Sequence, residues 1–270
     1  MTRSVDLPLD FLSYLDSESE RFLSVLRDAP SGTSVPTCPD WDTDDLLWHL
    51  AEVQWFWGQI VAGGITDGSE ADALELARPE GHDQLISLFE TAARDLRDAL
   101  SANPPEKTAW TWSDEQSVGF IRRRQAHEAL IHRVDAEVAV NQHSPLDTTL
   151  CVDGIDEAFR VMYGGTPPWG SFSPHQQQTI RVSLTDSAAS WLVTLGTFTG
   201  TDPKSGKSYD EPDIGILDDD PETEPSATIE GAAADVNCWL WHRPTQGPVR
   251  KKGHQEVLNA FEAVIAPGIN

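Results

Sequence analysis

Two side chains with metal-binding chemistry stand one helical turn apart in the middle of the chain. Glu128 and His132 are four residues apart, so on a helix they project from the same face. A second imidazole, His49, lies in an earlier segment whose apolar residues also repeat at helical spacing. One carboxylate and two imidazoles from two facing helices make a three-ligand site with an open position, which is typical of a catalytic zinc rather than a structural one.

The residues next to Glu128 and His132 exclude the zinc-protease motif and suggest partners for each of the two candidate ligands. His127 beside Glu128 suggests the HExxH motif of zinc proteases, but that motif needs two histidines four residues apart. His127 and His132 are five apart, which places them more than about 90° apart around a helix. Asp135 falls on roughly the same face as His132 and could accept its other ring N–H, or pair with an arginine. Arg124, one turn before Glu128, could compete for that carboxylate.

Each candidate ligand also has an ordinary structural interpretation. An ExxxH pair such as Glu128 and His132 can form a surface salt bridge. His49 has apolar neighbours, so it could be a core histidine satisfied by hydrogen bonding. Four tryptophans cluster along the same segment on both sides of His49, where some could line a ligand pocket but core packing is the stronger interpretation: Trp41, Trp48, Trp55 and Trp57.

Composition bounds the class of protein. The 270 residues suit one large domain or two small ones, and 39% hydrophobic residues are enough for a packed core. The formal net charge of -25 would repel a nucleic-acid backbone. No apolar run is long enough to span a membrane, and the first residues lack an apolar signal core. Three widely spaced cysteines argue against a disulfide framework. We therefore expect a cytoplasmic protein without nucleic-acid or membrane partners, and a monomer by default.

Residues 1–147 are expected to form a helical domain. Hydrophobic spacing and capping signals predict four helices of an antiparallel bundle, over residues 10–26, 42–61, 82–100 and 117–140. Asp42 is a good N-cap for the second helix, and Asp45 adds an acidic residue three positions later. A short helical piece is expected near residues 70–76. His49 then lies on the second predicted helix, and Glu128 and His132 lie on the fourth.

Residues 148–270 are expected to form a small α+β domain. Strands are predicted at residues 179–184, 190–196, 226–231 and 248–252, and helices at 232–242 and 254–265. A Gly/Pro/Trp-rich stretch over residues 163–175 is predicted to be a loop that could cover a substrate. An acidic Asp/Pro-rich stretch over residues 210–225 is predicted to be an exposed loop. His175 has no identified partner and is interpreted as a surface residue.

Over nearly its whole length, the chain resembles the mycothiol-dependent maleylpyruvate isomerase family of the DinB-like superfamily. Residues 35–50, VPTCPDWDTDDLLWHL, are similar to the family's C-P-x-W-x-x-x-D-L-x-x-H-L helix entry. Residues 124–137, RQAHEALIHRVDAE, are similar to R-x-A-H-E-x-x-x-H-R-x-D-A, the most specific of the three motifs. Residues 226–243, SATIEGAAADVNCWLWHR, are similar to a strand–helix unit that ends near Leu-Trp-x-Arg.

The resemblance implies a DinB-like four-helix bundle followed by a sterol-carrier-like α+β domain. It implies a divalent metal, usually zinc, held by His49, Glu128 and His132, with nickel, iron and manganese as alternatives. It also implies mycothiol as a thiol cosubstrate. The family's catalytic basic residue would fall on Arg243, for which a surface salt bridge at a helix end is the structural alternative. Cys38 is interpreted as a packing residue rather than a nucleophile.

Three functional hypotheses follow. The first is a metal- and mycothiol-dependent enzyme in which a thiol attacks a small electrophile, either as an S-transferase or as a cis–trans isomerase of the maleylpyruvate type. The second is a non-catalytic protein that binds a metal, a thiol or an apolar ligand. The third is a zinc hydrolase in which water fills the open position. The sequence of one shared site does not separate conjugation from isomerisation.

Overall fold

The computed structural model describes residues 9–217 and 223–269. The segment at residues 1–8, where no signal sequence is expected, and residues 218–222 of the expected acidic loop lie outside the described part. The chain divides into two compact units, one helical and ending at Pro145, the other α+β and beginning at Leu146. The predicted α+β class, a helical bundle followed by a mixed unit, is confirmed. Among the described residues, no helix combines the length and apolar character needed to cross a membrane.

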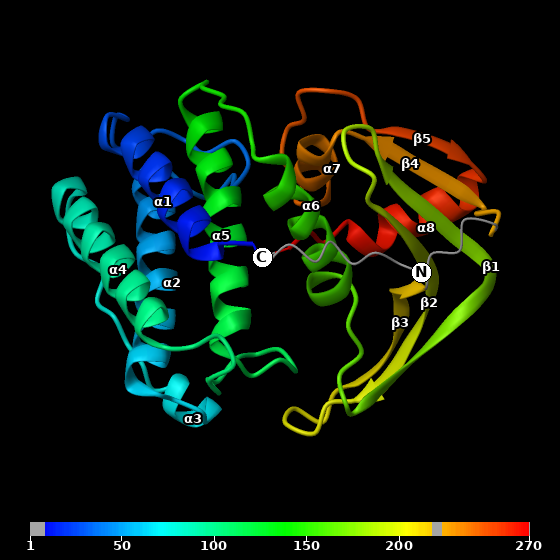
Figure 1. Ribbon diagram of the computed structural model, residues 1–270, viewed down its shortest axis with the longest axis horizontal. Coiled ribbons are helices and arrows are strands. Elements are labelled where there is room, and N and C mark those ends of the chain that lie inside the picture. Colours follow the sequence, from blue (N-terminus) through cyan, green and yellow to red (C-terminus); the bar gives the residue numbers. More distant parts are fainter. Residues whose placement is uncertain (1–8, 218–222, 270) are drawn as a thin grey trace. The chain divides into compact units, whose positions relative to one another are not determined.

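The helical unit contains the four predicted long helices, which run side by side (Figure 1). Its elements are α1 (Phe11–Arg27), α2 (Thr43–Gly63), the short α3 (Gly68–Ala71), α4 (His82–Ala102) and α5 (Val118–Ala139). The predicted start of α2 is confirmed, because Asp42 and Asp45 form a reciprocal capping box there. Gly64, at φ 64°, ends the helix in the left-handed conformation that glycine adopts without strain.

Ion pairs reveal the directions of the helices. Arg133 pairs with Glu18, and Glu137, one turn later, pairs with Arg21, so α5 runs parallel to α1. The contacts of α1 with α4 run the opposite way, from Asp16–Arg97 at one end to Arg27–Glu90 at the other. Together, α1 and α5 point one way, and α4 points the other.

The start of α2 lies beside the start of α4, where His82 Nδ1 is 2.7 Å from Asp44 Oδ1. Further along the same two helices, Gly58 lies against the backbone of Leu96. Thus α2 runs parallel to α4 and antiparallel to α5. The side chains of α1, α2 and α4 meet in an apolar core in which Phe22 and Phe89 pack at a centroid distance of 5.1 Å. Nearly the whole length of α5 is buried, including most of its polar residues.

The α+β unit begins with helices and continues into a five-stranded mixed sheet. Its elements are α6 (Thr148–Glu157), the π-helix η1 (Ala158–Met162), β1 (Gly170–Leu184), β2 (Ser190–Thr201), β3 (Ser208–Leu217), β4 (Ala227–Gly231), α7 (Ala233–Leu240), β5 (Arg250–Gly253) and α8 (Gln255–Ile265). The strand order is β3-β2-β1-β4-β5, with only the β1–β4 pair parallel. Helix α8 packs on this sheet (Figure 1).

Two stretches of this unit that were predicted to be loops are partly strands. The stretch expected as a covering loop over residues 163–175 enters β1 at Gly170, which pairs with Gly200 of β2. A register shift between Pro174 and Thr179 accommodates the proline, which cannot donate to the ladder. The acidic stretch begins as strand β3, where Pro212 is tolerated because an edge strand pairs on one side only. Helix α6 and the π-helix are additional elements that the sequence did not predict.

Candidate metal centre

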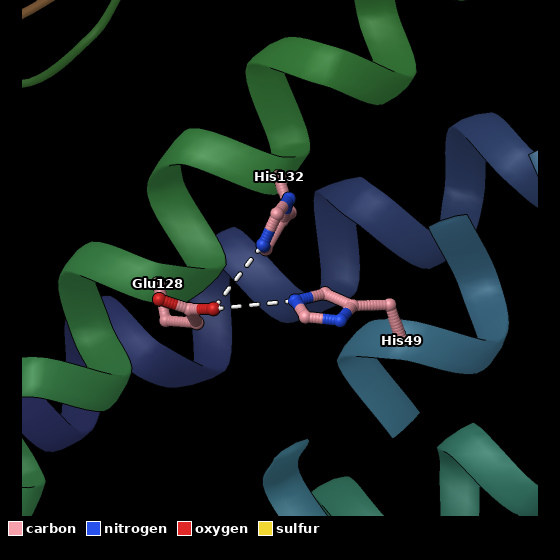
Figure 2. Close-up of side chains that lie close together, drawn as sticks. All are labelled: His49, Glu128 and His132. Atoms are coloured by element: carbon pink, nitrogen blue, oxygen red, sulfur yellow. Dashed lines mark hydrogen bonds and ion pairs between the residues drawn. The ribbon is translucent and has the colours of Figure 1, made fainter. Parts of the chain in front are cut away.

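Two helices bring the three predicted ligands together. His49 lies in the second turn of α2, and Glu128 and His132 lie one turn apart on α5. Figure 2 shows both imidazole rings directed at the same carboxylate oxygen of Glu128, one from each helix. One ligand atom from each residue lies within 4.8 Å of the other two. The grouping expected from sequence spacing is therefore present in the fold, although its use as a metal site stays a prediction.

The separations fit a small tetrahedral ion. His132 Nε2 is 3.2 Å from Glu128 Oε1, and His49 Nε2 is 3.5 Å from the same oxygen. Two ligands that each lie ~2.1 Å from a tetrahedral zinc are about 3.4 Å apart. The side chains of His49, Glu128 and His132 are 31%, 18% and 9% exposed, so the cluster is partly accessible and His49 is its most exposed member. Such a set of two nitrogens and one oxygen matches the ligands that zinc prefers.

A buried carboxylate orients His132. Asp135, whose side chain is fully buried, lies with Oδ2 3.0 Å from Nδ1 of the His132 ring. That contact occupies one ring nitrogen and leaves Nε2 to face Glu128 and His49. The same Asp135 oxygen accepts a weak hydrogen bond from the Cys38 thiol at 3.9 Å. Of the two partners considered for Asp135 in the sequence, His132 is confirmed.

The charges around the carboxylate are balanced. Arg124 lies 3.2 Å from Glu128 Oε2, the oxygen that does not face the imidazoles, so the predicted contact is confirmed. Burial alone would raise the pKa of Glu128, but hydrogen bonds from His132 and His49 and the Arg124 charge hold that pKa well below its ordinary value. Burial alone would lower the pKa of His132, but its bonds to Asp135 and Glu128 raise that pKa to about 9. The cluster thus keeps an ionised carboxylate ready as a ligand.

The turn before α2 places one aromatic ring beside the cluster, although the sequence favoured core packing for this tryptophan. The Trp41 ring lies 4.7 Å from the His49 ring and 6.4 Å from the His132 ring, measured between centroids. Trp41 is partly buried and also packs against the bundle core, so the expected packing role is confirmed. Its position in the C-P-x-W stretch was the available signal, but the inter-helix register needed to place it is not visible in a sequence.

Other candidate residues lie elsewhere. His127 is buried and meets the Phe11 ring edge-on at 6.1 Å, away from the ligand pair, as the spacing predicted. His175 is exposed on β1 and contacts Thr197, so its surface interpretation is confirmed. Arg243 follows α7 in the α+β unit, where its Nη1 donates to the Trp241 carbonyl at 2.6 Å. The predicted catalytic role of Arg243 stays a prediction.

These observations define a class: a four-helix bundle that carries a His/Glu/His cluster between two helices, followed by an α+β unit. Residues 12–137 match the family described as the mycothiol maleylpyruvate isomerase N-terminal domain. This range covers nearly all of α1 to α5. The helical unit of this chain is thus similar to that domain family over nearly its whole length, and the resemblance noted in the sequence is confirmed.

Solved structures extend the likeness beyond the helical unit. Crystal structures of the mycothiol-dependent maleylpyruvate isomerase and of a mutant of it match 93% of this chain and 96% of theirs. The TM-scores are 0.53 for the isomerase and 0.54 for the mutant, with 13% sequence identity in both cases. At this identity the comparison shows a common fold, which confirms the expected four-helix bundle followed by an α+β unit. No curated protein matches the sequence.

Proposed function

We propose that this chain is a mycothiol-dependent enzyme in which His49, Glu128 and His132 hold a divalent metal, with zinc preferred. The observation that carries the proposal is the convergence of these three donors on one point, in a unit that matches the family of a mycothiol-dependent isomerase. The separations between the donors and the oriented His132 ring fit such an ion. The substrate would be a small electrophile, and the thiol would be mycothiol.

The metal, when bound, would lower the pKa of a thiol in its open coordination position, so that the thiol is presented as a thiolate. The residues of the chain prepare this position. With a metal on Nε2, Asp135 would hold the remaining proton of His132 on Nδ1, and Arg124 would stay paired with the outer oxygen of Glu128. The Trp41 ring lies beside both imidazoles. In this proposal Arg243 binds the carboxylate of an acidic electrophile through its guanidinium group.

Two outcomes of thiol attack are compatible with this arrangement. In an isomerisation, the thiol adds to the double bond of a cis-enedione acid, the resulting single bond rotates, and the thiol leaves as the trans double bond re-forms. In a conjugation, the thiol stays on the carbon that it attacked. We favour isomerisation of a maleylpyruvate-type acid, because the matching solved structures are of such an isomerase. A free-thiol assay separates the two outcomes, since only conjugation consumes mycothiol.

The first test is metal content by mass spectrometry. We expect about one zinc ion per chain in the wild type and loss of that ion in a Glu128→Ala, His132→Ala double variant. His127→Gln is the matched control, because His127 is buried on the same helix, meets the Phe11 ring, and is not one of the three residues whose ligand atoms converge. Metal retained by the double variant would refute the ligand assignment.

The second test measures turnover of maleylpyruvate with and without mycothiol. Mycothiol-dependent formation of the trans product, lost in the double variant, supports the proposal. Hydrolysis of an ester or amide without any thiol would indicate a zinc hydrolase instead. Tight binding of mycothiol without reaction of any electrophile would indicate a binding protein, and either result would overturn the proposed activity.

A further inference from the structure

The end of helix α7 has a carbonyl group that its own helix cannot satisfy. In a continuing helix, the carbonyl of Leu240 would accept the N–H of the residue four positions later. That residue is Pro244, which has no N–H. Leu240 is fully buried, so water does not readily replace the missing donor. The hydroxyl of Tyr163 donates to this carbonyl at 2.5 Å and completes the helix end.

A π-helical turn places Tyr163 for this contact. The N–H of Tyr163 donates to the carbonyl of Ala158, five residues earlier, at 2.8 Å and closes η1. Such turns are rare and occur frequently at functional sites. Gly164 follows directly, and a Cβ atom there would lie 2.3 Å from the Phe159 carbonyl oxygen. The chain therefore turns tightly just after Tyr163, and only glycine fits the turn.

Arg243 is built into the same helix end. Its backbone N–H donates to the Cys238 carbonyl at 2.7 Å, and the preceding residue, His242, has a φ of 57° in the left-handed region. This is the hydrogen-bonding pattern of a helix C-cap. The Arg243 guanidinium donates to the Trp241 carbonyl at 2.6 Å. The carbonyls of Leu240 and of the C-cap residue Trp241 are thus bonded to side-chain donors, one from Tyr163 and one from Arg243.

Tyr163 and the guanidinium group interact electrostatically. Burial raises the pKa of the Tyr163 hydroxyl well above its ordinary value, while the Arg243 charge opposes that rise. The hydroxyl therefore stays protonated as a hydrogen-bond donor at any physiological pH. A hydroxyl that stays protonated at neutral pH is suited to a fixed hydrogen-bonding contact rather than to proton transfer.

We propose that Tyr163 is a positioning residue for Arg243. By donating to the Leu240 carbonyl in place of the absent Pro244 N–H, it holds the final turn of α7, and that turn fixes where the guanidinium of Arg243 projects. This inference rests on the proposed function for its catalytic consequence, since it assumes that Arg243 binds the acidic substrate. The bond between Tyr163 and the helix end is itself present in the structure.

The test uses Tyr163→Phe in the full-length, metal-loaded protein, with Tyr209→Phe as the control. Phenylalanine keeps the ring and removes only the hydroxyl, so the fold should persist. Amide hydrogen exchange in peptides covering residues 238–245 should quicken about tenfold in Tyr163→Phe and stay unchanged in the control. Unchanged exchange in Tyr163→Phe would overturn the proposed hold on the helix end.

Kinetics with mycothiol and maleylpyruvate test the link to Arg243. Tyr163→Phe should raise KM for the acidic substrate about tenfold, with KM for mycothiol unchanged. In an Arg243→Ala background the same substitution should change KM less than twofold, because the group that it positions is gone. Equal effects in both backgrounds would refute the positioning role. Absence of any turnover in the wild type would instead overturn the proposed function and this catalytic role, while the exchange data would still decide the structural role.

Discussion

Replacing Asp135 with asparagine should weaken metal binding without disturbing the ligands themselves. The carboxylate is fully buried, and its Oδ2 lies 3.0 Å from Nδ1 of His132. It fixes the ring so that Nε2 faces Glu128, and its negative charge makes the ring a stronger donor. An asparagine side chain has the same size but no charge, and it can present an N–H in place of the acceptor. The His132 ring then loses its charged hydrogen-bond partner and one constraint on its orientation.

The expected loss of zinc affinity can be estimated from other carboxylates that hydrogen-bond to metal-binding histidines. Loss of a carboxylate that supports a metal-bound histidine typically costs 10- to 100-fold in metal affinity, which is about 1.4 to 2.7 kcal/mol. The Asp135→Asn variant should therefore show a zinc dissociation constant raised within that range in a competition titration against a chelator. Circular dichroism should show an intact fold in the metal-loaded variant.

Glu137→Gln is the matched control for this experiment. Glu137 is a buried carboxylate on the same helix, two residues further on, but it contacts Arg21, Arg133 and Ser144 rather than a proposed ligand. The control should lose stability and keep its zinc affinity. A zinc dissociation constant in Asp135→Asn within threefold of the wild type, or an equal loss of affinity in Glu137→Gln, would refute the reasoning.

Two further predictions concern stability. Burial alone would raise the pKa of Glu137, but hydrogen bonds from Ser144 and Arg21 and the Arg133 charge lower it from its ordinary value of 4.5. Its contribution is then complete above pH 4.5 and is lost as the pH falls through the lowered pKa. Glu137→Gln should lower the free energy of unfolding, measured in urea at neutral pH, by about 2 kcal/mol. It should also weaken the loss of stability at acidic pH, and an unchanged loss would contradict the role given to Glu137. Gly196→Ala in β2 should cost about 2 kcal/mol or more, because the new Cβ would lie 2.4 Å from the Phe172 ring. Gly58→Ala, whose Cβ meets only ordinary contacts at 3.4 Å, is the comparison, and equal losses would show that crowding is not the cause.

The helical unit was readable from the sequence because its signals are local. The capping box at Asp42 and Asp45 and the i, i+4 pair of Glu128 and His132 depend only on residues within one or two turns of each other. Long amphipathic repeats with clear stops are the most reliable of sequence patterns. The three-ligand cluster could therefore be assembled once His49 was placed on a facing helix.

The surroundings of the cluster depend on contacts that no local pattern encodes. Cys38 lies 97 positions before Asp135, and only the packing of the turn before α2 against α5 brings the two together. Likewise, β3 contains Asp210 and Pro212, residues that are depleted in strands, and it forms because β2 offers an edge with which to pair. The π-helical turn at Tyr163 has no sequence signature that hydrophobic periodicity could reveal. Each of these features is set by contacts between segments that are distant in the sequence, and in β3 those contacts outweigh a poor strand propensity.

The parallel arrangement of α1 and α5 has a consequence for how the helical unit folds. The pairs Glu18–Arg133 and Arg21–Glu137 join residues 115 and 116 positions apart, whereas bundles of sequential hairpins close mainly short loops. A long loop must lose entropy before such contacts form, so the unit should fold slowly for an all-helical protein. During synthesis, α1 is made before α5, so its contacts with α5 cannot form until this last long helix of the unit has been synthesised. The cluster of His49, Glu128 and His132 is completed in the same final step, so closing the fold and assembling the site are one event.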